Sequence, residues 1–299
     1  MFLLSGPERL LALLFLVVTM LSIGTTTGAA QLRSLLASRG LMVRMLAANF
    51  IIVPVLGFAV ARFMPLKPET AGAIVLLACV PGGLSTIQFT SRIKGEKTLA
   101  GAMLVLLNVV ALLISPLILR MVLPAGADLT LPYGRILGFI ALWLLIPLGL
   151  GILLSDKAPG VAPKLSKMLG LVSLVLFIAF MVVTKSARKE AMASIGGTAV
   201  GAMVLFIIAS MAIGWFMGGP ARDKRQLLAT ITSMRNAAVC LMIVRNSPSG
   251  GAAMAPVIAF SLLMVTPNMV LTIYSTIRGA VLARKARGRN GESKKRKES

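Results

Sequence analysis

Eight stretches of this chain run for 17 residues or more without a charged side chain. They are residues 10–32, 45–61, 70–91, 98–119, 136–155, 168–184, 191–221 and 246–277. A helix of about 20 apolar residues crosses the hydrocarbon core of a bilayer, so each stretch predicts one span. A ninth span is predicted over residues 226–244, where Arg235 is the single charged residue. The turn-forming sequence NSPSGG opens the last stretch and leaves one helix there, not two.

The composition agrees with a membrane protein. Of the 299 residues, 57% are hydrophobic and 13% are charged, whereas an ordinary soluble domain has about 25% charged residues. We therefore predict an all-α integral membrane protein with nine transmembrane helices. The first stretch also has features of a secretory signal, but Glu8 beside Arg9 makes a poor basic leader, which favours a retained span.

The net charge of +22 lies mainly outside the predicted spans, and nine of the 31 Lys and Arg residues lie from Arg278 onward. We interpret residues 284–299 as a basic cytoplasmic tail that is attracted to anionic lipid headgroups, and we expect no nucleic-acid partner. With the N-terminus out and the C-terminus in, 21 basic residues face the cytoplasm and nine face the other side. The positive-inside rule favours that orientation.

Two spans carry signals of interruption near their centres. In CVPGGLSTIQFT (79–90), Pro81 lacks a backbone donor, and Gly82 and Gly83 have low helix propensity. The span 226–244 is polar at its centre, TSMRNAA. Within a bilayer, non-helical backbone is tolerated only where protein or a water-filled cavity surrounds it. The interruptions therefore predict a cavity.

The order of these signals indicates an internal repeat. Ser115-Pro116 follows the first interruption by one span, and Thr266-Pro267-Asn268 follows the second in the same way. Spans one to four thus resemble spans six to nine, and five crossings between equivalents would invert one half relative to the other. Inverted repeats with interrupted helices are typical of secondary transporters, whose sites lie near the midplane.

The sequence resembles the bile acid:sodium symporter family over residues 10–285. The motifs that carry the resemblance are ACVPGGLSTIQFTSRIKGE (78–96), SMRNAAV (233–239) and NFIIVP (49–54). The chain is most similar to a bacterial homologue of the nine-helix form, which implies a multi-pass protein of a bacterial-type inner membrane.

The resemblance also implies an architecture within a single transporter domain, residues 1–299. Core-domain helices would lie in residues 41–123 and 191–283, and panel-domain helices in residues 10–32 and 131–185. The two broken helices would cross inside the core domain, and the panel domain would move against it by alternating access.

The family's sodium site is poorly represented here. Its positions correspond to Asn49, Thr86, Ile87, Ala100, Leu104, Ile231 and Arg235. Ile, Ala and Leu side chains have no oxygen for a cation, and an arginine repels one. The nine acidic residues all lie in predicted loops or ends, and the chain has no His to carry a proton. We therefore doubt sodium coupling and expect no cofactor or metal.

Arg235 is the most informative single residue. Intramembrane ionisable residues cost about 2.5 to 3.5 kcal/mol to insert and usually serve function. Arg235 could replace the family's bound sodium, pair with an anionic substrate, or extend toward the membrane surface without a functional role. The candidate substrate and crossover residues are Pro81, Gly82, Gly83, Ser85, Thr86, Gln88, Thr232, Arg235, Asn236 and Asn268. Their polar side chains could equally form hydrogen bonds that hold neighbouring helices together.

These observations favour a secondary transporter of a small or amphipathic organic anion, without sodium coupling. Two alternatives remain: a sodium-coupled organic anion symporter, and a membrane receptor or scaffold that has lost transport. An enzyme is disfavoured because no paired acids, metal-ligand cluster or activated nucleophile occurs at membrane depth.

Overall fold

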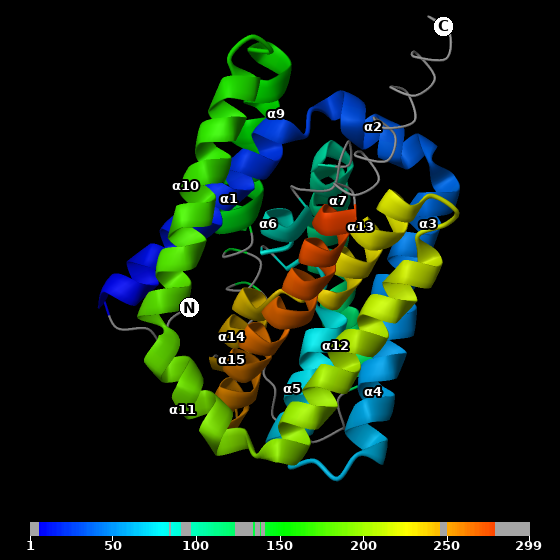
Figure 1. Ribbon diagram of the computed structural model, residues 1–299, viewed down its shortest axis with the longest axis vertical. Helices are drawn as coiled ribbons and strands as arrows, with labels where there is room; N and C mark the ends of the chain where they lie inside the picture. Colours follow the sequence, from blue (N-terminus) through cyan, green and yellow to red (C-terminus); the bar gives the residue numbers. More distant parts are fainter. Residues whose placement is uncertain are drawn as a thin grey trace, which may run out of the picture.

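The computed structural model describes residues 6–83, 85–90, 97–122, 134, 138, 141–245 and 250–278. Every regular element in these residues is a helix, and the helices form two groups (Figure 1). One group contains α1, α9 and α10, and the other surrounds α5, α12, α13, α14 and α15. The described residues thus agree with the predicted all-helical class.

The helices follow the chain in a simple order. They are α1 (Gly6–Thr26), α2 (Ala29–Ala37), α3 (Arg39–Ala47), η1 (Ala48–Ile52), α4 (Val53–Phe63), α5 (Pro68–Cys79), α6 (Thr86–Thr90), α7 (Lys97–Val122), η2 (Ala141–Leu145), α9 (Ile146–Lys157), α10 (Ala162–Val183), α11 (Lys185–Ile195), α12 (Gly197–Met217), α13 (Arg222–Ser233), α14 (Ala237–Arg245), η3 (Gly250–Ala253) and α15 (Met254–Leu263). After a turn at Met264, residues 265–278 are again helical.

Five helices in the described residues are long and apolar enough to cross a membrane, or six if the bent pair of α1 and α2 is one span. The broken pairs α5–α6 and α13–α14 are not among them, because each half is short. The length and apolarity of individual helices therefore identify fewer spans than the nine that the sequence predicts.

Two charge-free stretches extend beyond the helix that each contains. The stretch 10–32 contains most of α1, and the chain bends by 73° between α1 and α2. The stretch 191–221 contains α12, which begins after Gly196, whose φ of +81° favours glycine. Absence of charge does not reveal such breaks, because a helix end changes neither hydropathy nor charge.

Two π-helical turns precede prolines. η1 ends two residues before Pro54, and η2 ends two residues before Pro147. A proline has no N–H for the helical ladder, so a wide turn before it accommodates the missing bond. Asn49 lies in η1, and its Nδ2 donates to the backbone oxygen of Met45 at 2.9 Å.

The group of α1, α9 and α10 is joined by close backbone contact and by hydroxyl pairs. A Cβ on Gly151 of α9 would lie 2.8 Å from the Cα of Gly24 on α1, so only glycine fits this contact. Thr19 of α1 and Ser173 of α10 are hydrogen-bonded at 2.6 Å. Small residues and hydroxyl pairs of this kind are typical of helix contacts in membranes.

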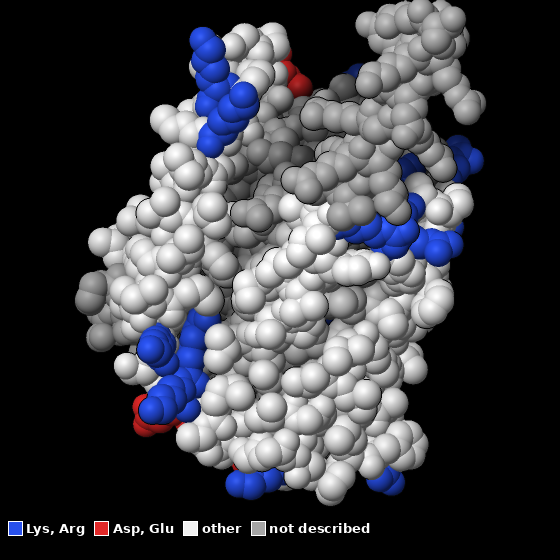
Figure 2. Space-filling model, viewed as in Figure 1, with Lys and Arg blue, Asp and Glu red and all other residues white. Residues whose placement is uncertain are grey.

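The surface also has the character of a membrane protein. Many Leu, Val, Ile and Phe side chains are exposed on α4, α9, α10 and α12, including Phe63 and Phe216 at 83% and 80%. On the face drawn in Figure 2, basic side chains lie in the upper part and in the lower part of the view, and the described surface between them is uncharged. This distribution fits an apolar belt flanked by two aqueous faces.

Candidate functional site

The first broken helix opens at residues 80–83, between α5 and α6. Pro81 and Gly82 follow Val80, and Gly82 has φ +84°, in the left-handed region that favours glycine. A Cβ on Gly83 would lie 2.7 Å from the backbone oxygen of Arg235, so only glycine fits here. The predicted interruption is present, and its backbone comes very close to that of the second broken helix.

The second broken helix opens at residues 234–236, between α13 and α14. Pro81 and Arg235 form an isolated antiparallel β-bridge. The N–H of Gly83 donates to the oxygen of Met234 at 3.3 Å, and the N–H of Asn236 donates to the oxygen of Val80 at 3.0 Å. The two helices therefore cross where both are unwound, and each satisfies backbone groups of the other. We call residues 80–83 and 234–236 the crossover.

A third helix ties the crossover together through Asn108 of α7. Its Nδ2 donates to the oxygens of Leu104 at 2.8 Å and Gly82 at 3.4 Å. Its Oδ1 accepts a hydrogen bond from Nδ2 of Asn236 at 3.3 Å. One buried amide thus contacts both unwound segments.

The guanidinium of Arg235 lies inside the protein, with 0% exposure. Nη1 donates to Oδ1 of Asn49 at 3.3 Å, and Nδ2 of Asn49 in turn approaches Oγ1 of Thr232 at 3.4 Å. Nε and Nη2 of Arg235 have no hydrogen-bond partner among the described residues. A buried charged group without partners is costly, so these donors are suited to an anion.

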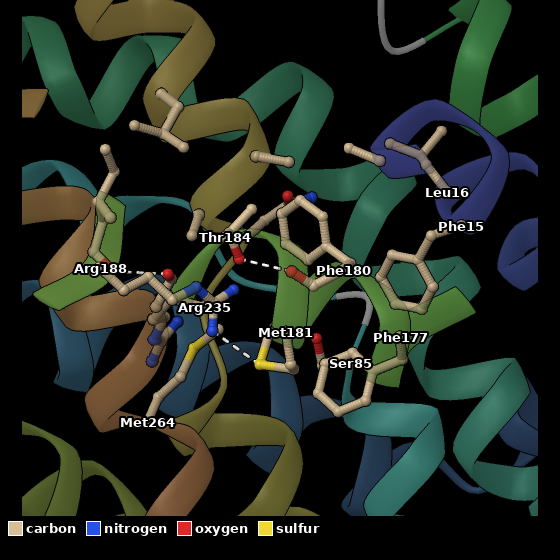
Figure 3. A pocket seen from close by; sticks show the side chains of 17 residues that line it. Phe15, Leu16, Ser85, Phe177, Phe180, Met181, Thr184, Arg188, Arg235 and Met264 are labelled. Atoms are coloured by element: carbon tan, nitrogen blue, oxygen red, sulfur yellow. Dashed lines mark hydrogen bonds between the residues drawn. The ribbon is translucent and has the colours of Figure 1, made fainter. Parts of the chain in front are cut away.

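A cavity of about 120 Å³ lies beside the crossover, between the two helix groups. It is lined by Ala12, Phe15, Leu16, Ser85, Phe177, Phe180, Met181, Thr184, Arg188, Arg235, Asn236, Ala237, Ala238, Leu241, Ile258, Ser261 and Met264. In Figure 3, the labelled side chains of Arg188 and Arg235 lie on one side of the view, and those of Phe15 and Phe177 lie on the other. The cavity therefore has a basic side and an aromatic side.

The predicted candidate residues divide between the cavity and the surrounding structure. Ser85, Arg235 and Asn236 line the cavity, whereas Pro81, Gly82 and Gly83 form the crossover behind it. The remaining candidates, Thr86, Gln88, Thr232 and Asn268, are not among the lining residues.

Two of these remaining candidates form hydrogen bonds between helices. Nε2 of Gln88 donates to Oγ of Ser173 at 2.7 Å, and Oδ1 of Asn268 accepts from Ser233 at 3.0 Å. Both contacts match the alternative that such side chains bind neighbouring helices.

The former sodium positions are mostly apolar and enclosed. Ile87, Ala100, Leu104 and Ile231 are all buried, at 0% to 6% exposure. Of the oxygen-bearing positions, Asn49 is hydrogen-bonded to Arg235, and Oγ1 of Thr86 is buried without a partner in the part of the chain that the structure describes. The described residues contain no group of three or more His, Cys, Asp or Glu side chains placed to hold a metal.

Two residues of the site, Arg188 and Asn108, were not predicted from the sequence. Arg188 lies in KSARKEAMASI, which has the composition of a solvated connection. Yet Arg188, Ala191 and Ile195 are all buried, and their spacing of three and four residues places them on one helix face. That periodicity was the available signal for Arg188. For Asn108 it was a lone amide within the apolar stretch 98–119.

Helices that are unwound around a buried cation and an amphipathic cavity define a membrane transporter. The comparison with known proteins identifies the family: the model of the Sodium Bile acid symporter family matches residues 13–195. The chain belongs to this family, whose members are multi-pass membrane transporters and not enzymes.

Individual relatives agree with this assignment. The chain is 23% identical over 275 residues to "Uncharacterized sodium-dependent transporter YocS" of Bacillus subtilis, covering 90% of this chain and 81% of that protein. It is 31% identical over 163 residues to the hepatic sodium/bile acid cotransporter of Rattus norvegicus, covering 53% and 44%. It is 23% identical over 236 residues to the probable chloroplastic sodium/metabolite cotransporter BASS2 of rice, covering 79% and 54%. The chain thus spans about half the length of the latter two relatives.

Proposed function

We propose that this protein is a secondary transporter of a small or amphipathic organic anion, which binds in the cavity beside the crossover. The observation that carries the proposal is Arg235, a residue that lines the cavity and whose fully buried guanidinium has two nitrogens without hydrogen-bond partners among the described residues. The acid group of the substrate would accept hydrogen bonds from Nε and Nη2. Its apolar body would lie against Phe15 and Phe177.

The proposed transport cycle is alternating access between the two helix groups. In this proposal the nine spans form an inverted repeat, with residues 41–123 and 191–283 as the core domain and residues 10–32 and 131–185 as the panel domain. The hydrogen-bonded crossover supports a rigid core, because it joins α5, α7 and α13. The cavity is lined by α1 and α10 on one side and by the crossover on the other, which supports a substrate site between moving parts.

We further propose that transport does not depend on sodium. The positions of the family's sodium ligands hold Ile87, Ala100, Leu104 and Ile231, which are buried and offer no side-chain oxygen. Asn49 and Thr86 are the two remaining side chains that could give an oxygen ligand to sodium. Oδ1 of Asn49 already accepts a hydrogen bond from the guanidinium of Arg235. An uncoupled carrier of a monovalent anion works against about 2.3 kcal/mol per 100 mV for entry into a negative interior. Such a carrier would equilibrate or export its substrate.

The names of three relatives favour a second candidate, a sodium-coupled organic anion symporter. In that case Oγ1 of Thr86, which is buried and has no hydrogen-bond partner among the described residues, would be a ligand of sodium. A receptor or scaffold on the same fold would bind the anion without exchanging it.

Exchange assays in proteoliposomes distinguish these functions. Purified protein is reconstituted with 1-naphthyl sulfate, a monovalent amphipathic anion, inside the vesicles, and entry of labelled 1-naphthyl sulfate is followed in sodium and in potassium. We expect exchange at rates that agree within about twofold. Accumulation that collapses without sodium would establish the symporter, and saturable binding without exchange would establish the receptor.

We also propose that the N-terminus faces out and that the basic tail, residues 284–299, faces the cytoplasm beside anionic lipids. The tail lies outside the described residues, and the charge asymmetry of the sequence supports this orientation. The test is labelling of Ser5→Cys and Asn290→Cys in a background without Cys79 and Cys240, using an impermeant maleimide on intact cells. We expect labelling at residue 5 only, and labelling at residue 290 would reverse the topology.

A further inference from the structure

The cavity contains a second buried cation, Arg188 of α11. Its side chain is 5% exposed, and its guanidinium carbon lies 5.3 Å from the centroid of the Phe180 ring. Nη1 lies 2.7 Å from Sδ of Met181, a contact that Figure 3 shows as a dashed line. Neither neighbour carries a negative charge. Burial lowers the pKa of Arg188 to about 10, so the side chain stays protonated at neutral pH.

Arg188 and Arg235 both line the cavity. Among the described residues that line it, Arg188 and Arg235 are the charged ones, and none is Asp or Glu. Like charges that share a desolvated space repel each other, and each needs a partner to offset its lost hydration. A ligand with one negative charge would offset one of the two.

We propose that the substrate is an amphipathic dianion, with a doubly charged acid head that binds both Arg188 and Arg235 and an apolar body that lies against the aromatic side. Guanidinium groups bind phosphate and carboxylate oxygens with paired N–H donors, and two of them can surround one tetrahedral head group. Arg188 is then the residue that selects a dianion over a monoanion. This inference rests on the proposed anion site at Arg235.

The matched probes are 1-naphthyl phosphate and 1-naphthyl sulfate. They share the aromatic body and a tetrahedral head, but the phosphate monoester carries a charge of about −1.5 to −2 at pH 7 because its second pKa is about 6. Lowering the pH from 7.5 to 5.0 converts the phosphate mainly to a monoanion and leaves the sulfate unchanged. Arg188 keeps its charge throughout, since both values lie well below its pKa of about 10.

Binding of both probes is measured by calorimetry on the full-length protein in detergent. At pH 7.5 we expect the phosphate to bind at least about tenfold more tightly than the sulfate, the effect of one charge-assisted hydrogen bond. At pH 5.0 we expect the two affinities to agree within about threefold, because about nine-tenths of the phosphate is then monoanionic.

Variants assign the selectivity to Arg188. Arg188→Gln should bring the affinity ratio of phosphate to sulfate at pH 7.5 close to one, while sulfate binding persists through Arg235. Arg188→Lys should retain a preference for phosphate, because the positive charge remains. The control is Lys189→Gln, which removes a charge from an exposed neighbour on the same helix that does not line the cavity. This variant should keep the wild-type ratio.

The outcomes separate this inference from the proposed function. If neither probe binds the wild-type protein, the anion site itself is wrong, and both proposals fail. If the sulfate binds but the phosphate shows no preference at pH 7.5, the dianion inference fails and the anion site stands. A preference that survives in Arg188→Gln also overturns the role of Arg188. The ratio in the wild-type protein at the two pH values remains decisive if the variants do not fold.

Discussion

The two unwound segments of the crossover open for different reasons. Residues 80–83 contain Pro81, which has no N–H, and Gly82, whose φ is +84°. Residues 234–236 contain neither proline nor glycine, and their open backbone is held by hydrogen bonds to Val80 and Gly83. The first segment is unwound by its own covalent chemistry, whereas the second is unwound because the first offers it partners. A break in a membrane helix therefore need not be predictable from the residues at the break itself.

The largest effect should come from Gly83, where the two backbones meet. Gly83→Ala would place a Cβ 2.7 Å from the backbone oxygen of Arg235, and neither backbone can move without losing the crossing bonds. We expect the substitution to lower the free energy of unfolding by about 3 kcal/mol, the upper end of overpacking costs. Thermal unfolding in detergent measures this.

The matched control is Gly72→Ala in α5, where a Cβ would meet nothing within 4 Å. It should raise stability by about 0.5 to 1 kcal/mol, as alanine does in helix interiors. Equal effects of the two substitutions would mean that the backbones do not pack against each other at Gly83.

A smaller effect is expected at Asn236, whose side chain supports the second segment. Its Nδ2 donates to Asn108 at 3.3 Å, and its Oδ1 accepts from the N–H of Val239 at 3.3 Å, as a helix cap does. Asn236→Ala should cost about 1 to 2 kcal/mol in the same unfolding measurement. A loss as large as that of Gly83→Ala would show that side chains, and not the backbone, hold the second segment open.

The smallest effect is expected away from the crossover, at Ser173. Its Oγ contacts Thr19 at 2.6 Å and Gln88 at 2.7 Å, so it links α10 to α1 and α6. Hydroxyl bonds between membrane helices contribute about 0.6 kcal/mol on average, and Ser173→Ala should cost about that much. Destabilisation by 2 kcal/mol or more would place the main polar support of the fold between the helix groups instead.

The same contrast explains how much the sequence predicts. Charge-free length predicts helices in residues 45–61, 98–119 and 168–184, and the structure has helices over residues 39–63, 98–115 and 162–183. Proline with glycine predicts the first break. The second break was predicted from polarity and family resemblance, since no local propensity requires it. The bend of 73° after Thr26 was not predicted, because charge-free length carries no signal for it. Beyond the bend, the N–H of Ala29 donates to Asp156, a residue far away in the sequence.

The candidate site was only partly predictable for a related reason. Arg235 is conspicuous because it is the single charge in its span. Arg188 is inconspicuous because it stands beside Lys185, Lys189 and Glu190, and only the fold turns it toward the cavity. Which member of a charged cluster is buried depends on packing, and packing is set by residues far away in sequence.

Arg235→Met provides the most direct measurement of the central claim, that the buried guanidinium binds the substrate anion. Among the described residues the guanidinium makes one hydrogen bond, of 3.3 Å, and two of its nitrogens have no partner, so it contributes little to folding and is free to bind an anion. We therefore expect the unfolding midpoint to stay the same or rise. Binding of 1-naphthyl sulfate should weaken by 1.5 to 3 kcal/mol, about 10- to 150-fold, in both sodium and potassium. Wild-type affinity in Arg235→Met would contradict the account.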